Sequence, residues 1–204
     1  MSGYGHILLH RAVEYLDEVS DGILKDGGAE EAAGVIKGCA LTAAIAGVGS
    51  GWIPGAGGAF ATAAFVASIW SMYVLINKKL GISTKDNVLK TLASAFLTNI
   101  LAAAGSALLG LAVGSVLSFI PVVGTAASIA IDAMIGYIVV FVSGILYLNL
   151  IGKMCTKYGK VDFDEVDVKK LAKEVVNESD LKEMVNQAKA SFKDDKKAGK
   201  MDKK

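Results

Sequence analysis

Charge is missing from two long stretches of this chain. Between Lys37 and Lys78 no residue is Asp, Glu, Lys or Arg, and between Lys90 and Lys153 the single residue of these types is Asp132. A helix at the surface of a soluble protein normally carries a polar face, and stretches this long without charge leave none. The two stretches therefore predict helices that lie in a lipid bilayer.

Cysteine and net charge are also scarce. The two cysteines, Cys39 and Cys155, lie too far apart in the sequence to form a metal motif or a disulfide framework. A net charge of +1 gives no basis for nucleic-acid binding. No pair of carboxylates and no Ser-His-Asp or Cys-His arrangement is recognisable. We therefore expect neither an enzyme nor a cofactor, and the mixed opening residues predict no secretory signal.

Histidine occurs twice, near the beginning of the chain. His6, His10 and Glu14 recur at a spacing of four and share one face of a predicted helix. They form a weak candidate for a metal site, because the pattern lacks the glutamate of the HExxH motif. Exposed histidines near a terminus are the favoured interpretation, so we expect no bound metal.

The spacing of apolar residues divides the chain into five parts. We expect an N-terminal amphipathic helix over 1–28, a first apolar hairpin over 29–80 and a second over 81–158. Amphipathic helices follow over 159–192, and a charged tail over 193–204 is expected to be disordered. The predicted fold class is all-α, with two apolar helical hairpins forming a four-helix membrane bundle flanked by amphipathic helices.

A short hinge motif occurs twice, as "GWIPGAGGAF" and "SFIPVVGTAA", 67 residues apart. Pro54 and Pro121 each end a helix, while Gly57 and Gly124 allow the chain to reverse and the next helix to approach closely. The motifs predict the turns of the two hairpins, on the side away from the charged residues. Internal duplication and chance similarity of small residues both explain the repeat.

Small residues form stripes along the predicted apolar helices. Helices in lipid associate by close backbone approach through such residues. The candidate packing residues form three groups: Gly110 and Gly114 in a GxxxG spacing, Ala59, Ala63 and Ala67, and Gly136 and Gly144. Packing within one chain and packing between copies both fit the pattern.

Asp132 is the one carboxylate in the second apolar stretch. It follows Pro121 by eleven residues, about 16 Å along a helix, which places it near the middle of a bilayer. An ionisable group at that depth indicates a proton or cation site or an anchor between helices. A protonated carboxyl bonded to Ser128 is the structural alternative, and it is the favoured one.

The segments "WIPGAGGAF", "IWSMYVLINKKLGIS" and "FIPVVGTAASIAIDAMIGY" resemble a bacterial membrane-associated domain of unknown function, the YcjF type, which is often appended to small GTPases. The resemblance covers about residues 32–154. This chain departs from the GTPase-linked forms because it contains no GTPase domain. The resemblance implies a helical-hairpin fold at a bacterial membrane and no established activity.

Together these patterns predict a non-enzymatic, oligomeric membrane protein that scaffolds or remodels membrane, or recruits a cytoplasmic protein through its terminal helices. Lysines gather in the connector 78–90 and again over 153–160, so we expect both termini on the cytoplasmic side. The expected partners are the lipid bilayer and further copies of the chain, with no nucleic acid. A pore of holin or effector type, and a soluble helical protein that buries its hairpins in an oligomer, are the alternatives.

Overall fold

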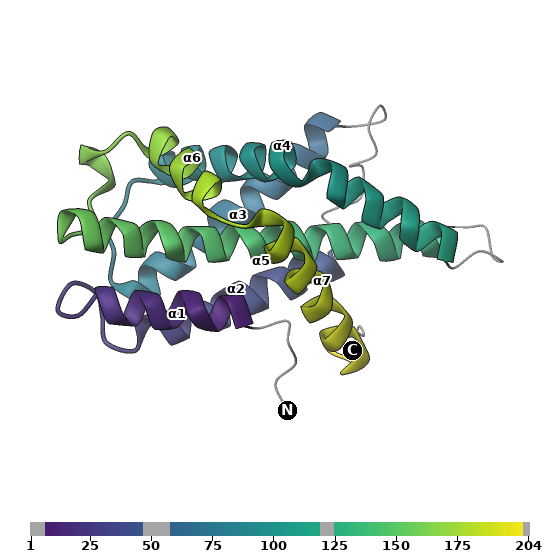
Figure 1. The fold of residues 1–204 in the computed structure, drawn as a ribbon, viewed down its shortest axis with the longest axis horizontal. Helices are drawn as coiled ribbons and strands as arrows, with labels where there is room; N and C mark the ends of the chain where they lie inside the picture. Colours follow the sequence, from purple (N-terminus) through teal and green to yellow (C-terminus); the bar gives the residue numbers. More distant parts are fainter. Residues whose placement is uncertain (1–6, 47–57, 119–124, 202–204) are drawn as a thin grey trace.

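Seven α-helices and one short 3-10 helix make up the described part of the chain, in which no strand occurs (Figure 1). The computed structural model describes residues 7–46, 58–118 and 125–201, with side chains described except for 58–62, 103–118, 125–132 and 165. This confirms the predicted all-α class. The arrangement of two apolar hairpins as a membrane bundle stays a prediction.

The helices follow one another with short connections. In chain order they are α1 (Ile7–Val19), α2 (Gly28–Ile45), α3 (Gly58–Leu80), α4 (Asp86–Ser118), α5 (Thr125–Tyr158), η2 (Phe163–Glu165), α6 (Val168–Glu178) and α7 (Leu181–Lys197). Aspartates begin the last two α-helices. The side chain of Asp167 accepts the backbone N–H groups of Lys169 and Lys170, and the side chain of Asp180 accepts that of Glu183. These caps satisfy N–H groups that a helix start otherwise leaves unpaired.

Helix α5 runs through the middle of the molecule and contacts each of the other six α-helices (Figure 1). Every residue from Met134 to Leu148 is buried. A helix covered on all sides has no need of a polar face. Enclosure by the chain's own helices therefore accounts for the absence of charge in this part of α5.

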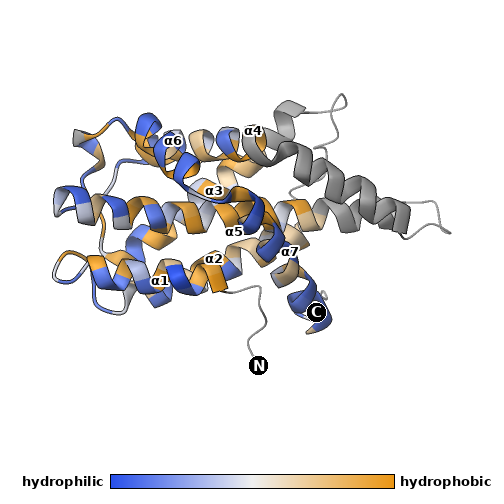
Figure 2. Cartoon of the chain, viewed as in Figure 1, coloured by the Kyte–Doolittle hydropathy of each residue, from blue (hydrophilic) through white to orange (hydrophobic). Residues whose placement is uncertain are grey.

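The terminal helices are amphipathic, as expected, and they cover the apolar helices (Figure 2). Helices α1 and α7 pack on α5, and α6 packs on α4. Their buried faces are formed by Leu9, Ala12, Val13 and Leu16 in α1, Leu171, Ala172, Val175 and Val176 in α6, and Leu181, Met184, Val185, Ala188 and Phe192 in α7. The sequence predicts terminal helices that lie beside a separate apolar bundle. In the structure these helices pack directly on α4 and α5.

Two predicted boundaries need correction. The N-terminal helix ends at Val19 instead of continuing to residue 28, because the carbonyl of Ser20 accepts the N–H groups of Ile23 and Leu24 in a turn. The tail expected to be disordered from residue 193 is helical as far as Lys197. That extension buries Asp195, whose partners are described below.

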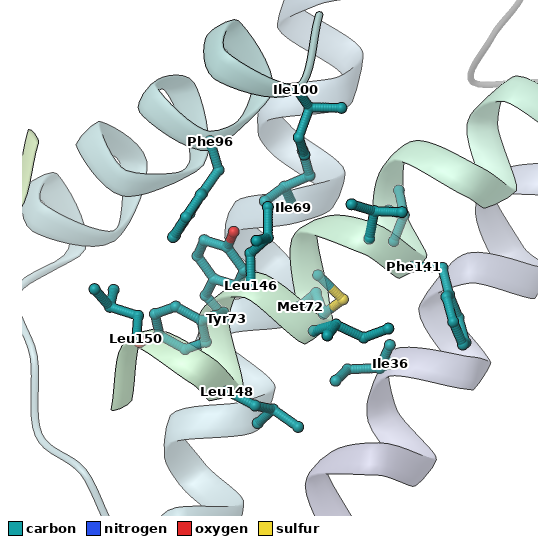
Figure 3. Close-up of a cluster of buried hydrophobic side chains, with 14 of the residues drawn as sticks. Ile36, Ile69, Met72, Tyr73, Phe96, Ile100, Phe141, Leu146, Leu148 and Leu150 are labelled. Carbon is teal, nitrogen blue, oxygen red and sulfur yellow. The ribbon is translucent and has the colours of Figure 1, made fainter. Parts of the chain in front are cut away.

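One core cluster includes side chains from all seven α-helices, and its centre is formed by large apolar side chains of α2, α3, α4 and α5 (Figure 3). Ile36 belongs to α2, Met72 to α3, Phe96 to α4 and Phe141 to α5, and none of the four is exposed. Full burial of a side chain of this size contributes about 1.5–3 kcal/mol relative to exposure. Packing of α2, α3 and α4 around α5 therefore contributes substantially to the stability of the fold.

Gly144 of α5 lies against the side chain of Ile36 in α2. A Cβ placed on Gly144 would lie 2.7 Å from Cγ1 of Ile36, closer than van der Waals contact allows. Ile36 is fully buried and cannot move aside freely. The absence of a side chain at Gly144 therefore lets the two helices pack at this distance.

We expect Gly144→Ala to lower the free energy of unfolding by about 1 kcal/mol, because overpacking outweighs the gain in helix propensity. Gly34→Ala on α2 is the matched control, since a Cβ there meets nothing within 4 Å. The control is expected to raise the free energy of unfolding by about 0.5–1 kcal/mol. Denaturant unfolding followed by circular dichroism measures both. Equal stabilisation by the two substitutions would contradict the packing of Gly144 on Ile36.

Candidate functional site

Several residues singled out from the sequence lie outside the described residues or carry side chains that are not described. The first group comprises Pro54, Gly57, Pro121, Gly124 and His6. The second comprises Ala59 in α3, Gly110 and Gly114 in α4, and Asp132 in α5. Their proposed roles as hinges, packing residues and intramembrane carboxylate stay predictions.

His10 and Glu14 pair on the outer face of α1. Nε2 of His10 lies 3.2 Å from Oε1 of Glu14, and the two side chains are 72% and 63% exposed. In the described part of the chain no group of three or more His, Cys, Asp or Glu residues is placed to hold a metal ion. The pair is a surface interaction between neighbours one helical turn apart.

The small-residue stripes fall into different environments. Gly136 and Gly144 are buried in α5, whereas Ala63 and Ala67 are exposed on α3. The exposed side of α3 continues through Ser71, Val74 and Leu75, and it carries no charge over this length. We name this surface, from Ala63 to Leu75, the α3 face. It points away from the chain's own helices, so it is available for contact with lipid or with another protein.

One end of the molecule collects the connectors that the sequence predicts to lie together. The N–H of Lys25, before α2, donates to the carbonyl of Leu80 at the end of α3, at 3.1 Å. Nζ of Lys85, before α4, lies 2.7 Å from Oδ2 of Asp164 in η2. We name this region the lysine end. Its cations are partly neutralised, because carboxylates lie beside them.

Glu31 is one of these carboxylates. Nζ of Lys79 lies 2.9 Å from Oε2 of Glu31, and Nζ of Lys25 lies 3.8 Å from Oε1. The hydrogen bond from Lys79 and the charges of both lysines hold the pKa of Glu31 below its usual value. At the other pair, the hydrogen bond to Asp164 and its negative charge raise the pKa of Lys85. One pair links α3 to α2, and the other links the connector before α4 to η2.

Buried tyrosines join α3 to α5, and sequence periodicity gave no sign of them. The hydroxyl of Tyr73 lies 2.6 Å from Oγ of Ser143, and that of Tyr147 donates to Oδ1 of Asn77 at 2.7 Å. The rings of Tyr73 and Tyr147 stack with centroids 3.9 Å apart. Because a buried tyrosine normally finds a partner for its hydroxyl, tyrosines within apolar runs are the one signal that could have revealed these contacts.

A third buried tyrosine, Tyr137, connects α5 to α7. The hydroxyl of Tyr137 donates to Oδ2 of Asp195 at 2.8 Å and lies 3.1 Å from Oγ of Ser191. Asp195 is 3% exposed, and its Oδ1 accepts from Nζ of Lys200 at 2.7 Å. A buried carboxylate is tolerated when it is paired in this way. We name Tyr137, Ser191, Asp195 and Lys200 the α7 clasp.

Among the described residues, one helical segment is long and apolar enough to cross a bilayer. It runs over Ala133–Tyr158 in α5 and spans 26 residues. Of its most apolar 18-residue window, 94% is buried inside the molecule. The core helix of a soluble protein has the same length and composition. The coarse expectation of a membrane-compatible segment is therefore met, while the number of crossings and the side of each terminus stay predictions.

No protein-family model, curated protein or solved structure matches this chain. The resemblance of its Ile-Pro segments to the YcjF-type membrane domain stays a prediction, as do the membrane location, the oligomeric state and the absence of enzymatic activity. A functional proposal for the chain therefore starts from its own residues and their contacts.

We expect Tyr137→Phe to lower the free energy of unfolding by about 1.5–3 kcal/mol, because it removes a hydrogen bond to a buried carboxylate. Amide exchange in α7 is expected to accelerate in the same variant. Tyr158→Phe, at the exposed end of the same helix, is the control and is expected to change stability by less than about 0.5 kcal/mol. Equal effects of the two substitutions would show that the α7 clasp does not hold α7.

We expect the carboxyl of Glu31 to titrate below 4.5, its usual value. A lowered pKa in the folded state stabilises the protein above about pH 4.5, and this contribution is lost as the pH falls through the lowered value. Carbon-detected NMR titration measures the midpoint directly. Lys79→Gln is expected to raise that midpoint, and Glu31→Gln removes this part of the acid dependence. A midpoint of 4.5 or higher in the unmodified chain would refute the prediction.

Proposed function

We propose that this chain is a non-enzymatic membrane protein that inserts the hairpin between α4 and α5 into a bilayer. In this proposal the helical body formed by the described side chains stays at the membrane surface. There it scaffolds the membrane or recruits a partner, in one or more copies. The observation that carries the proposal is the composition of the second part of α4.

Helix α4 changes character along its length. Its first part packs on α3, α5 and α6 as far as Ile100, which is fully buried. The rest of the helix, Leu101–Ser118, contains no charged residue and measures about 27 Å at 1.5 Å per residue. The hydrocarbon core of a bilayer is ~30 Å thick. The second part of α4 therefore matches one crossing in length and composition.

Helix α5 limits how the hairpin enters. Its residues from Met134 to Leu148 are buried under the other six helices, so a full crossing by this part requires those helices to separate from it. The residues before it, from Thr125 to Asp132, carry one ionisable group. We therefore propose partial insertion, in which the hairpin tip enters lipid and the body remains folded around α5.

Two further features support a place at a membrane. The α3 face is uncharged and exposed, and its small residues suit close contact with a neighbouring helix. The lysine end lies at the opposite end of α4 from Ser118, consistent with the excess of lysine that cytoplasmic loops carry. On this basis we propose that the lysine end and the terminal helices face the cytoplasm.

A soluble helical protein is the second candidate, and the enclosure of α5 favours it. Because 94% of the most apolar 18-residue window of α5 is buried, the other helices cover this window without lipid. In that case the uncharged part of α4 would be covered by another copy of the chain. The two candidates differ in where the protein is found after cell fractionation.

We expect the chain to remain in the membrane pellet after carbonate extraction and to be released by detergent. Leu109→Lys, at the centre of the uncharged part of α4, is expected to reduce the pelleted fraction, because a lysine at mid-membrane costs about 2.5–3.5 kcal/mol. Asn177→Lys on the exposed side of α6 is the matched control and is expected to pellet normally.

Recovery of the unmodified chain in the carbonate supernatant would refute membrane insertion and favour the soluble candidate. Equal pelleting of both lysine variants would refute insertion of α4. Release of a dye trapped in liposomes would replace scaffolding with pore formation. In that assay Asp132→Ala tests whether Asp132 contributes to the pore.

A further inference from the structure

A groove of about 590 Å³ lies between α4 and α6, along the first part of α4. Most of its lining surface is apolar, and its polar groups belong to lysine, threonine, serine and asparagine, with no acidic residue among the lining residues. It is lined by Lys90, Thr91, Ser94, Ala95, Thr98, Asn99, Lys169 and Lys173. Three lysines therefore border one open space whose lining contains no acidic residue.

Other lysines nearby are paired with carboxylates. Nζ of Lys153 lies 2.7 Å from Oε1 of Glu178, and Lys85 is paired with Asp164. In the described part of the chain, Lys90, Lys169 and Lys173 have no carboxylate within ion-pair distance. Lys169 and Lys173 are four residues apart on one helix face, where like charges repel. An anion in the groove would relieve that repulsion.

Groups around the groove can also donate hydrogen bonds to a ligand. Nζ of Lys90 lies 4.8 Å from the centre of the ring of Trp70, a residue outside the lining, so Lys90 borders the groove while its ammonium group contacts the indole. The hydroxyl of Thr98 donates to the carbonyl of Ser94, whereas the hydroxyl of Ser94 is exposed and has no partner among the described residues. Ammonium groups and this hydroxyl can all donate hydrogen bonds. The fitting ligand is a compact anion with several acceptor oxygens.

We propose that the groove between α4 and α6 binds the phosphate of a phosphate ester. Lysine binds phosphate as a point charge, and three lysines match a phosphate better than a single carboxylate. Two sources supply this chemistry: the headgroup of an anionic phospholipid and a soluble phosphate ester. The headgroup source rests on the proposed membrane function, while the soluble source does not.

The position of the groove favours the headgroup. It ends at Asn99, two residues before Leu101, where the segment proposed to enter the bilayer begins. A helix that enters the bilayer at Leu101 places Thr98 and Asn99 in the headgroup layer and leaves Lys90 about 16 Å from Leu101, on the aqueous side of that layer. The positive charge of the three groove lysines is a local feature, because the whole chain has a net charge of only +1.

The test compares two triple variants of the full chain with equal charge changes. Lys90, Lys169 and Lys173 are replaced by glutamine in the groove variant, and Lys170, Lys182 and Lys193 are replaced by glutamine in the control. All six side chains are exposed, and none of the control lysines lines the groove. Circular dichroism establishes that both variants keep the helical content of the unmodified chain.

The first arm measures binding to vesicles of phosphatidylcholine alone and of phosphatidylcholine with 30% phosphatidylglycerol. We expect the preference for anionic vesicles to fall about fivefold for each groove lysine removed, and to change less than twofold in the control. Equal loss in the two variants would overturn the proposal, because it would show general electrostatic attraction. An unchanged preference in the groove variant would overturn it as well.

The second arm titrates glycerol 3-phosphate and inorganic phosphate into the chain in uncharged detergent, followed by calorimetry. Binding that the groove variant loses, with no preference for anionic vesicles, assigns the groove to a soluble phosphate ester and supports the proposal. The same binding by a chain that fails carbonate pelleting would refute the membrane function and leave the groove assignment standing. Absence of binding in both arms would overturn the groove assignment even if the chain pellets with membranes.

Discussion

Enclosure of α5 by six helices is the constraint on which the rest of the structure depends. A helix without charge from Met134 to Leu148 must be covered by something apolar, and α1 to α4, α6 and α7 each contribute to the covering. The amphipathic pattern of α1, α6 and α7 follows from this demand, since each presents one apolar face inward. The polar contacts of α5 follow as well, because tyrosine hydroxyls in a closed core need partners.

Local features of the fold could be predicted from the sequence. Spacings of three and four place Leu9 and Leu16 on one face of α1, and Leu171 and Val175 on one face of α6, and all four are buried. The covering of α5 could not be predicted, because Val139 and Val142 are equally suited to lipid and to other helices. The absence of charge indicates that this part of α5 is shielded from water. It does not indicate whether lipid or other helices provide the shielding.

The long-range polar pairs could not be predicted from the sequence, for a different reason. Tyr137 and Asp195 are 58 residues apart, and Tyr73 and Ser143 are 70 apart, so no local periodicity links them. A charged segment such as the one around Asp195 has the composition of a disordered tail, and one buried hydrogen bond decides otherwise. Among the predicted site residues, Gly144 gains a contact with Ile36 that explains its small size, while the α3 face keeps Ala63 and Ala67 exposed.

The α7 clasp also has a consequence for how the protein is made. Helix α5 is synthesised before α6 and α7, so the last part of its covering to be made is the last part of the chain. Synthesis of the following residues, 159–201, takes roughly 2–9 s at the usual rates of translation. Asp195 and Lys200 can therefore join Tyr137 only after nearly all of the described chain has been made, and the most central helix of the fold is the last to be fully covered.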